Sequence, residues 1–428
     1  MKVLVVGSGG REHTLAWQIK KSPKLSKIYC APGNAGTASL ATNVPIPSND
    51  LDGLLAFALS EQIDLTVVGP EDPLVAGIAD RFQEAGQAVV GPTAAAAQLE
   101  GSKAFAKNFM KKHGIPTADY QTFSVAKEAA DSLRSGRFQF PVVLKADGLA
   151  AGKGVFICPN LEESLKTVAL VMKEKRFGSA GNQLVVEEFL EGEEASFMVF
   201  SDGILAVPMV PSQDHKTAYD GDRGPNTGGM GTYSSDSILS SQERQQVLDQ
   251  IITPTIKGMA EGGHPYHGIL YAGLMITSQG PKVLEFNVRL GDPETQVVLP
   301  RIKSDLLDVF QAMTAGSLSG SKIEWSEDAT VCVVIASGGY PGSYTTGKEI
   351  SGLDMVEEDS DTVVFHAGTS LKKSITITSG GRVLGVTSQA PNLRKAILKA
   401  YEGVNKIHFE DMHYRRDIAA KGLKKEIK

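Results

Sequence analysis

The most informative part of the chain reads KVLEFNVRLGDPETQ and covers residues 282–296. Its apolar start predicts a strand over Lys282–Phe286, and the similar run Ile269–Thr277 before an intervening Gly-Pro turn predicts the antiparallel partner. Side chains two apart on a strand face the same side, so Glu285 and Asn287 project together while the phenylalanine between them packs behind. Because carboxylate and amide oxygens are ligands that suit Mg²⁺, this pair predicts a metal site.

Arg289 lies two residues further along the same face, where its guanidinium would neutralise an oxyanion or a γ-phosphate. After it, residues 291–294 (GDPE) turn the chain. A Glu-x-Asn triplet on its own is commonly just an exposed polar strand edge. The metal hypothesis therefore depends on further phosphate-binding residues elsewhere in the chain.

A second cluster, KADGLAAGKG at residues 145–154, supplies such residues. It is one residue too short for a P-loop, and Gly154 stands where that motif needs Ser or Thr for Mg²⁺. A different phosphate clamp fits better. Lys145 would point from a rigid strand at the α/β phosphates, and a flexible loop with Gly152, Lys153 and Gly154 would close over the β/γ phosphates. A solvated lysine followed by a hairpin turn is the alternative for this segment alone.

The first hundred residues alternate short apolar runs with helical patterns, which predicts a doubly wound parallel sheet. The first run, Lys2–Val6, leads into Gly7-Ser8-Gly9-Gly10. This cluster begins like G-x-G-x-x-G, but position 12 is Glu and no acidic residue ends the second strand, so NAD is disfavoured. Free N–H groups at the start of the next helix suit another phosphorylated small molecule, and a purely structural turn is the alternative.

We divide the chain into three predicted domains. An α/β substrate-binding domain covers residues 1–101, and a central domain covers residues 102–325, with a lid subdomain at about 118–190. Residues 326–428 contain short strand patterns between glycine-rich turns, which predicts a smaller, mainly antiparallel domain that packs over the active site. The glycine-rich segment 212–235 reads as an irregular functional loop with no regular element.

Composition limits the partners of the chain. The formal net charge is −6 at pH 7, whereas a nucleic-acid-binding protein usually has a basic face. The three cysteines, Cys30, Cys158 and Cys332, are too far apart for a zinc site or a disulfide framework and favour a reducing compartment. Apolar runs are too short for a signal peptide or a membrane span. We expect a cytoplasmic protein with no nucleic-acid or membrane partner.

The order of these motifs resembles the ATP-grasp superfamily and, within it, the phosphoribosylamine–glycine ligase family of purine biosynthesis. The resemblance runs nearly end to end and implies an ATP-grasp fold for the central domain. Two motifs are long and specific: GPNTGGMG at residues 224–231 and RLGDPETQ at residues 289–296. The shorter motifs lie at residues 7–13, 31–34, 68–71, 145–154, 186–190 and 213–216.

The resemblance implies a nucleotide site. Lys107 and Lys145 match the two lysines that bind the phosphates of ATP, and Glu194 matches the carboxylate on its ribose hydroxyls. The hinge that holds adenine matches Glu187, Glu188, Phe189 and Leu190.

The resemblance also implies a metal site and a mechanism. Glu285 and Asn287 match the ligands of Mg²⁺ or Mn²⁺, and the preceding strand, residues 271–276, carries no further carboxylate, which leaves the number of ions open. No side-chain nucleophile is needed. Catalysis would rest on positioning and on charge neutralisation, with Arg289 and Lys145 as the catalytic residues.

Two small-molecule substrates are implied, glycine and 5-phosphoribosylamine. Glycine would be activated by ATP as glycyl phosphate, and the amine of 5-phosphoribosylamine would then displace phosphate. The residues implied for phosphoribosylamine are Gly9, Glu12, Asn34, Pro70 and Glu71. Those implied for glycine and the transferred phosphate are Asp214, Lys216, Asn226, Thr227, Gly228, Gly229, Arg289, Asp292 and Glu294.

Two other functions are compatible with the residues. A different ATP-grasp ligase would keep every nucleotide residue and change only the loops around 214–231 and the first domain. A nucleotide-binding regulator would bind ATP without substrate-dependent formation of ADP. The intact set of lysines and metal ligands argues against the regulator.

Overall fold

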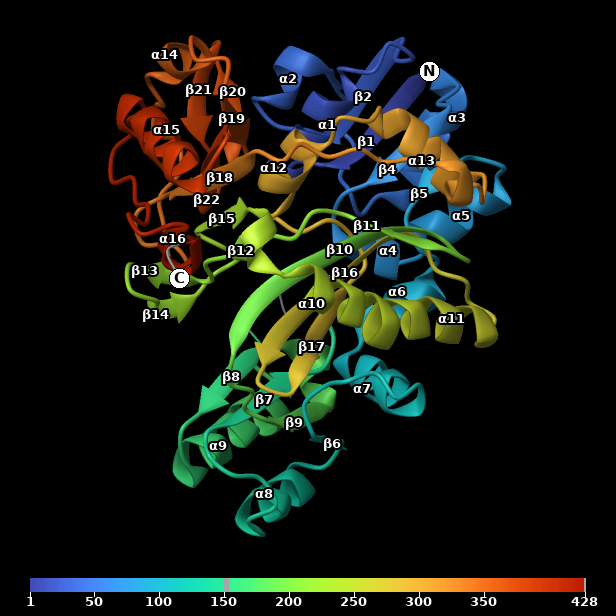
Figure 1. Cartoon of the computed structure of the whole chain (residues 1–428), viewed down its shortest axis with the longest axis vertical. Coiled ribbons are helices and arrows are strands. Elements are labelled where there is room, and N and C mark those ends of the chain that lie inside the picture. The colour runs from blue at the N-terminus through green and yellow to red at the C-terminus, as the bar shows by residue number, and fades with distance from the viewer. Residues whose placement is uncertain (150–153, 427–428) are drawn as a thin grey trace.

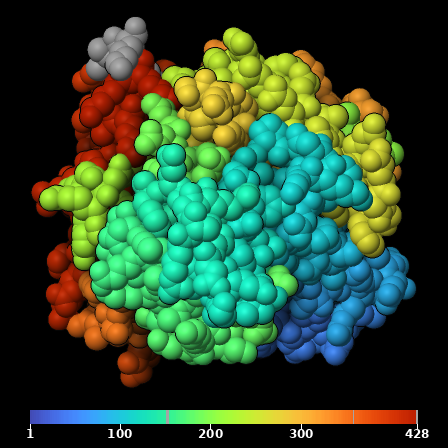
Figure 2. Space-filling model, turned by 90° about the horizontal axis from the view of Figure 1, so that it is seen from below, coloured from blue at the N-terminus to red at the C-terminus, as the bar shows by residue number. Residues whose placement is uncertain are grey.

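The computed structural model describes residues 1–149 and 154–426. The amino-terminal and carboxy-terminal sheets lie together at one end of the molecule, and a small sheet from residues 120–188 lies at the other end (Figure 1). Seen from that second end, the small sheet and its helices cover the centre of the face (Figure 2). Among the described residues, no helix is both long and apolar enough to cross a membrane.

The amino-terminal unit is a parallel five-stranded sheet in the order β3-β2-β1-β4-β5. Its strands are β1 (Lys2–Gly7), β2 (Lys27–Pro32), β3 (Thr42–Asn43), β4 (Leu65–Val68) and β5 (Val89–Val90). The helices are α1 (Gly10–Ile19), α2 (Thr37–Leu40), α3 (Leu51–Glu61), α4 (Glu71–Val75), α5 (Ile78–Glu84) and α6 (Ala94–Gly101). This order confirms the predicted doubly wound sheet. Because the order reverses between β1 and β4, the loops after these two strands meet where such sheets bind ligands.

The central unit contains two antiparallel four-stranded sheets. One has the order β6-β9-β7-β8 and the other the order β11-β10-β16-β17. Their strands are β6 (Tyr120–Phe123), β7 (Val142–Ala146), β8 (Val155–Cys158), β9 (Leu184–Glu188), β10 (Glu193–Asp202), β11 (Ala206–Pro208), β16 (His267–Thr277) and β17 (Gly280–Asn287). The helices are α7 (Lys103–Lys112), α8 (Ala126–Arg134), α9 (Leu161–Val168), α10 (Ser241–Val247), α11 (Thr253–Glu261), α12 (Thr295–Val298) and α13 (Leu306–Thr314). Two π-helical segments, Ala169–Lys173 and Leu248–Ile252, extend α9 and join α10 to α11.

Strands β16 and β17 form the predicted hairpin, with one irregularity that matters for the site. Phe286 is 2% exposed and belongs to the largest hydrophobic core, so it packs behind the strand as expected. The pairing passes from Glu285 to Val283 with no counterpart for Leu284. This β-bulge leaves the Leu284 carbonyl outside the ladder, where another donor can use it.

The carboxy-terminal unit is built on an antiparallel sheet in the order β12-β15-β18-β22-β19. Three of its strands are β18 (Ala329–Ala336), β19 (Thr362–His366) and β22 (Arg382–Ala390), and β20 (Thr369–Lys372) pairs with β21 (Ile375–Thr378) beside them. The helices are α14 (Leu353–Glu357), α15 (Leu393–Lys406) and α16 (Ala420–Glu426). The antiparallel arrangement confirms the predicted class, whereas the domain limits at 101/102 and 325/326 stay predictions.

The prediction for residues 212–235 was wrong, because the segment contains four short strands. Strands β12 (Gln213–Asp214) and β15 (Gly231–Ser234) complete the carboxy-terminal sheet, and β13 (Thr217–Tyr219) pairs with β14 (Arg223–Asn226). Glycine weakens an isolated strand but does not prevent extended backbone. Here β12 and β15 satisfy their backbone N–H and C=O groups within the carboxy-terminal sheet, and β13 and β14 do so by pairing with each other.

Two buried histidines join the amino-terminal unit to the carboxy-terminal unit. The backbone N–H of His366 donates to Nδ1 of His13 at 2.7 Å, and the rings stand edge to face with centroids 5.5 Å apart. Asn34 donates to the His366 carbonyl at 2.8 Å. Burial, helped by His366, lowers the pKa of His13 to about 3, so this histidine is neutral in the folded protein near neutral pH.

This neutral histidine makes stability fall in mild acid. The unfolded chain protonates His13 near pH 6.5 and the folded chain only near pH 3, so protons favour the unfolded state between these values. Through His13 alone, the free energy of unfolding is about 2 kcal/mol lower at pH 5 than at pH 7. We expect His13→Gln to lose less stability between pH 7 and pH 5 than the wild type, measured by thermal unfolding. The exposed His264→Gln is the control, and an unchanged pH dependence in His13→Gln would contradict the assignment.

Candidate functional site

Side chains from all three units line one cavity of about 430 Å³. The four residues on which the nucleotide hypothesis rests, Lys107, Lys145, Glu285 and Asn287, all lie in its wall although they are up to 180 residues apart in the chain (Lys107 to Asn287). The other predicted site residues in the wall are Glu71, Gly154, Asp214, Lys216, Thr227, Gly228, Arg289, Asp292 and Glu294.

Helix α7 and the turn after β7 hold the lysines in place. The side chain of Ser102 caps α7, and Asp147 accepts a hydrogen bond from the Ala104 N–H at 3.0 Å. A carboxylate at a helix amino terminus is favoured by the free N–H groups and the helix dipole. The turn after β7 is thereby fixed to α7. Lys103 and Lys107 lie one helical turn apart and both reach the cavity.

Glu187 forms ion pairs with both Lys107 and Lys145. Its two carboxylate oxygens form ion pairs with the ammonium groups of Lys107 and Lys145, and all three side chains are buried. Lys107 also donates to the Thr117 hydroxyl at 2.8 Å, and Lys145 donates to the Leu284 carbonyl that the bulge leaves free, at 3.0 Å. Glu187, which the resemblance assigns to the adenine hinge, thus pairs with the two lysines that the resemblance assigns to the phosphates.

Burial and charge oppose each other at this triad. Burial lowers the pKa of Lys107 to about 8, since the effect of burial and of the nearby Lys145 outweighs the attraction of Glu187. For Glu187, burial acts to raise the pKa, but the two lysines outweigh it and the pKa is lowered. The carboxylate is thus ionised, and one negative charge offsets part of the repulsion between two buried ammonium groups.

The residues predicted to bind metal fit a divalent cation. Burial acts to raise the pKa of Glu285, but Lys216, Lys145 and Lys103 lower it further than burial raises it, so the carboxylate is ionised. Asn287 lines the same cavity, and its amide oxygen accepts a hydrogen bond from Arg289 at 3.1 Å. An ionised carboxylate beside an amide oxygen is a hard-oxygen pair of the kind that Mg²⁺ and Mn²⁺ use. Within residues 1–149 and 154–426, no group of three or more His, Cys, Asp or Glu side chains has metal-site geometry.

Arg289 is fixed by two carboxylates. Its guanidinium donates to Glu71 at 3.1 Å and to Glu100 at 2.8 Å, and also to the Asn287 amide oxygen at 3.1 Å. Burial acts to lower the pKa of Arg289, but Glu100 and Glu71 raise it further, so the charge is permanent. The arginine thereby ties the end of β17 to α6 and to the first residue of α4.

A mixed cluster occupies another part of the cavity. Lys216 lines the cavity and forms an ion pair with Glu194. Glu194 itself is not part of the described cavity wall. Glu294 accepts a hydrogen bond from the Tyr271 hydroxyl at 2.8 Å. Burial raises the pKa of Asp214. Lys216 acts to lower this pKa, but the nearby carboxylates of Glu294 and Glu194 act with burial to raise it. A site with paired carboxylates beside a lysine can bind an ammonium and a carboxylate of one small molecule.

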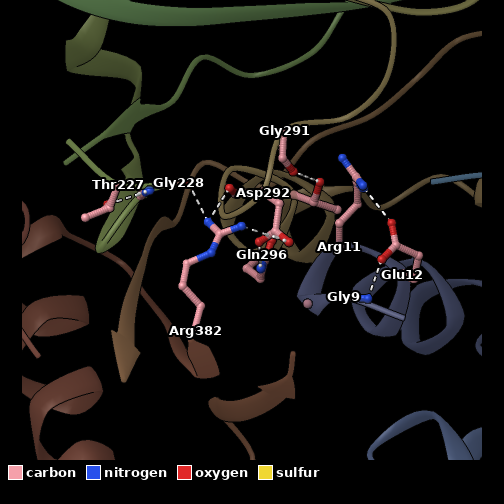
Figure 3. Close-up of polar contacts among 12 residues, drawn as sticks. Gly9, Arg11, Glu12, Thr227, Gly228, Gly291, Asp292, Gln296 and Arg382 are labelled. Carbon is pink, nitrogen blue, oxygen red and sulfur yellow. Dashed lines mark hydrogen bonds and ion pairs between the residues drawn. The ribbon is translucent and has the colours of Figure 1, made fainter. Parts of the chain in front are cut away.

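The predicted residues of the first glycine loop lie mostly outside this cavity. Glu12 is 2% exposed and folds back to accept from the Gly9 N–H, while Arg11 donates to its other oxygen at 2.6 Å (Figure 3). A Cβ atom at Gly69 would stand 2.0 Å from this carboxylate, so that glycine leaves room for Glu12. Asn34 uses its amide for hydrogen bonds with the backbone of its own loop, of Ser8 after β1 and of β19. Both side chains have structural roles here.

The remaining predicted residues are placed as follows. Pro70 precedes α4, Asn226 ends β14, and Gly229 packs against Pro293, all outside the described cavity wall. Glu188 pairs with Lys282 at 3.5 Å, Phe189 is partly exposed and Leu190 packs in a small apolar cluster, also outside that wall. Gly152 and Lys153 lie outside the described residues.

Among the described residues, six polar or charged side chains of the cavity wall were not predicted as site residues: Arg11, Glu100, Lys103, Tyr271, Tyr340 and Arg382. Two carried a usable signal, because Arg11 belongs to the first glycine motif and Lys103 stands four residues before Lys107 on one helix face. Tyr340 and Arg382 come from the carboxy-terminal unit, and only the tertiary structure brings them to the cavity.

Sequence models of one family match the chain in three consecutive parts. The N domain of phosphoribosylglycinamide synthetase matches residues 1–100, its ATP-grasp (A) domain matches residues 101–295, and its C domain matches residues 330–421. The chain is 49% identical over 423 residues to phosphoribosylamine–glycine ligase of Halalkalibacterium halodurans, covering 99% of this chain and 97% of the relative. It is 50% identical over 430 residues to the enzyme of that name from Escherichia coli K12, covering 100% of both.

Solved structures agree with these matches. The crystal structure of phosphoribosylamine–glycine ligase from Thermotoga maritima superposes with a TM-score of 0.84 at 34% identity, over 97% of this chain and 100% of that one. The biotin carboxylase domain of 2-oxoglutarate carboxylase from Hydrogenobacter thermophilus gives a TM-score of 0.71 at 17% identity, over 96% and 91% of the chains, and shares the fold alone. The predicted ATP-grasp fold is confirmed.

The Glu187 triad predicts how ATP use depends on pH. The free protein loses the proton of Lys107 near pH 8, so kcat/KM for ATP should fall above that pH, by up to about tenfold per pH unit. Glu187→Gln removes the charge that raises the pKa of Lys107, and the fall should begin at a lower pH. The measurement is initial rate against ATP concentration between pH 6 and pH 10. Exposed Glu84→Gln is the control, and an identical profile in Glu187→Gln would show that the triad does not set the titration.

Proposed function

This chain belongs to the phosphoribosylglycinamide synthetase family, and from that membership we propose that its cavity joins glycine to 5-phosphoribosylamine through a glycyl phosphate intermediate. The chain is an ATP-dependent carbon–nitrogen ligase of purine biosynthesis that forms ADP. The observation that carries the detailed proposal is the meeting of Lys107, Lys145, Glu285 and Asn287 in one cavity.

The proposed nucleotide site uses the charges of that cavity. ATP and a divalent metal ion are the co-substrate and cofactor of ATP-grasp enzymes. We assign the triphosphate to Lys107 and Lys145 and the ion, Mg²⁺ or Mn²⁺, to Glu285 and Asn287. The ion, when bound, neutralises phosphate charge and acts as a Lewis acid. Glu187 holds the two lysines before the nucleotide arrives. The lysines therefore need little reorganisation during the reaction.

In the first step, a carboxylate oxygen of glycine attacks the γ-phosphorus of ATP. A new phosphorus–oxygen bond forms, the bond between the γ-phosphorus and the β–γ bridging oxygen breaks, and ADP leaves. Glycyl phosphate results. Arg289 and Lys216 lie where they can balance the charge of the attacking carboxylate and the moving phosphoryl group, and Asp214 and Glu294 lie where they can bind the ammonium group of glycine.

In the second step, the amine nitrogen of 5-phosphoribosylamine attacks the carbonyl carbon of glycyl phosphate. The carbon–nitrogen bond forms, the bond between the carbonyl carbon and the phosphate oxygen breaks, and inorganic phosphate leaves while the nitrogen releases one proton. We place this substrate at the switch point of the amino-terminal sheet, beside Glu71 and the loop after β1. Exclusion of water from the cavity during the reaction would protect the acyl phosphate from hydrolysis.

We also propose that the reaction takes place in the cytoplasm. Cys30, Cys158 and Cys332 are free and buried, which supports a reducing compartment.

Removal of the metal-binding carboxylate tests the site. Glu285→Ala should fold normally, because the side chain lines the cavity and is not part of the hydrophobic core, and should lose glycine-dependent ADP release by about 10²–10³-fold. The assay measures ADP with glycine and 5-phosphoribosylamine present, and omission of either substrate gives the background. Exposed Glu84→Ala should keep the wild-type rate. Wild-type turnover by Glu285→Ala would rule out the metal assignment.

An oxygen label tests the intermediate. When glycine carries ¹⁸O in its carboxylate, attack on the γ-phosphorus puts one labelled oxygen into the new phosphorus–oxygen bond, and cleavage in the second step leaves that oxygen on phosphate. Mass spectrometry of the released phosphate should therefore show one ¹⁸O per turnover. Unlabelled phosphate from an active enzyme would exclude glycyl phosphate.

A further inference from the structure

Arg382 belongs to the carboxy-terminal unit, and its side chain reaches the active-site cavity. It is the first residue of β22, and its side chain is part of the cavity wall. Figure 3 shows its guanidinium between the segment with Gly228 and the segment with Asp292. We call residues 224–231 the glycine loop and residues 289–295 the aspartate turn. Nη1 of Arg382 donates to the backbone carbonyl of Gly228 and, at 2.6 Å, to that of Asp292, and Nη2 lies 3.4 Å from the Asp292 carboxylate.

Gly228 is held from both sides by the carboxy-terminal unit. Its carbonyl accepts from Arg382, and its N–H donates to the Tyr340 hydroxyl at 3.1 Å. A Cβ atom at this position would stand 3.1 Å from the centre of the guanidinium, which is tighter than ordinary van der Waals contact. The absence of a side chain at Gly228 thus lets the arginine lie flat against the glycine loop.

The two loops that Arg382 joins carry the residues assigned to glycine and the transferred phosphate. In the glycine loop, Thr227 donates from its N–H and its hydroxyl to the Lys216 carbonyl, at 2.7 and 2.8 Å. Any shift of Gly228 therefore reaches Lys216 through one neighbouring residue. The aspartate turn contains Arg289 and Glu294, three residues before and two residues after Asp292.

We propose that Arg382 is a positioning residue for the ligase reaction, which sets the glycine loop and the aspartate turn at the spacing that glycine and the transferred phosphate require. The inference rests on the proposed assignment of glycine to these loops. It gives the carboxy-terminal unit a function within the reaction beyond packing. A planar guanidinium with five donors can bind two carbonyls and a carboxylate at once, whereas a lysine ammonium cannot match that geometry.

The test compares Arg382→Met and Arg382→Lys with the wild type and with Arg394→Met. Arg394 is an exposed arginine of the same unit on α15 with no contact to the cavity wall. ADP release is measured against glycine at saturating ATP and 5-phosphoribosylamine. Direct binding of MgATP and thermal unfolding are measured on the same preparations.

We expect Arg382→Met to lower kcat/KM for glycine by about 10²-fold, the size of effect that a misplacement of about 1 Å produces. Its affinity for MgATP should stay within about twofold of the wild type, because Lys107, Lys145 and Glu187 make no contact with the arginine. The kcat/KM of Arg382→Lys for glycine should lie between the values of Arg382→Met and the wild type, and that of Arg394→Met should match the wild type. Free guanidinium ion should partly restore an Arg382→Ala variant, whose short side chain leaves the site open, but not Arg382→Lys, whose side chain fills the site.

Two results would overturn the inference. One is a folded Arg382→Met with wild-type kcat/KM for glycine. The other is an equal loss of MgATP affinity, glycine use and thermal stability, which is the signature of a purely structural tie. If Arg382→Met does not fold, Tyr340→Phe decides the question, because it removes only the hydroxyl that accepts from Gly228 and should raise KM for glycine with little effect on MgATP binding. A wild type that is inactive with both substrates would instead disprove the proposed function.

Discussion

Two ammonium groups are buried side by side in this protein, and one carboxylate makes that possible. Glu187 lies diagonally across from Lys145 on neighbouring strands, since β7 and β9 pair Val143 with Glu187 and Lys145 with Val185. Helix α7 brings Lys107 to the other carboxylate oxygen. Without that carboxylate, two like charges would be desolvated together at a cost of several kcal/mol. The pairing of β7 with β9 and the position of α7 therefore set the spacing of the two cations.

The rest of the cavity balances charge in the same way. Arg289 is held by Glu71 and Glu100, and Lys216 is held by Glu194, so each cation has a partner before any ligand is present. A highly charged substrate then enters a site whose groups are already oriented, which is the condition for electrostatic catalysis. The partners come from different units, and the fold of each unit is needed to place them.

The sequence allowed good predictions where function followed local periodicity. Glu285 and Asn287 project into the cavity because side chains alternate on a strand, and Phe286 is buried for the same reason. The parallel sheet at the amino terminus was predictable from the alternation of strands and helices.

Prediction failed where partners are distant in sequence. Nothing near Glu187 indicates that two lysines 80 and 42 residues earlier will bind its oxygens. The bulge at Leu284 gives no sequence signal, although it frees a carbonyl for Lys145. The segment 212–235 was predicted as irregular because its glycines lower strand propensity, but a neighbouring sheet supplies the hydrogen bonds that make strands of it. Tertiary context overrode local preference in each case.

A crystal structure of the protein with Mn²⁺ and a non-hydrolysable ATP analogue is the most direct test, because the anomalous scattering of manganese locates the ion independently of the protein atoms. The account predicts the ion within coordination distance of Glu285 and Asn287, with the β and γ phosphates between it and the ammonium groups of Lys107 and Lys145. An ion elsewhere, or a triphosphate that contacts neither lysine, would contradict it.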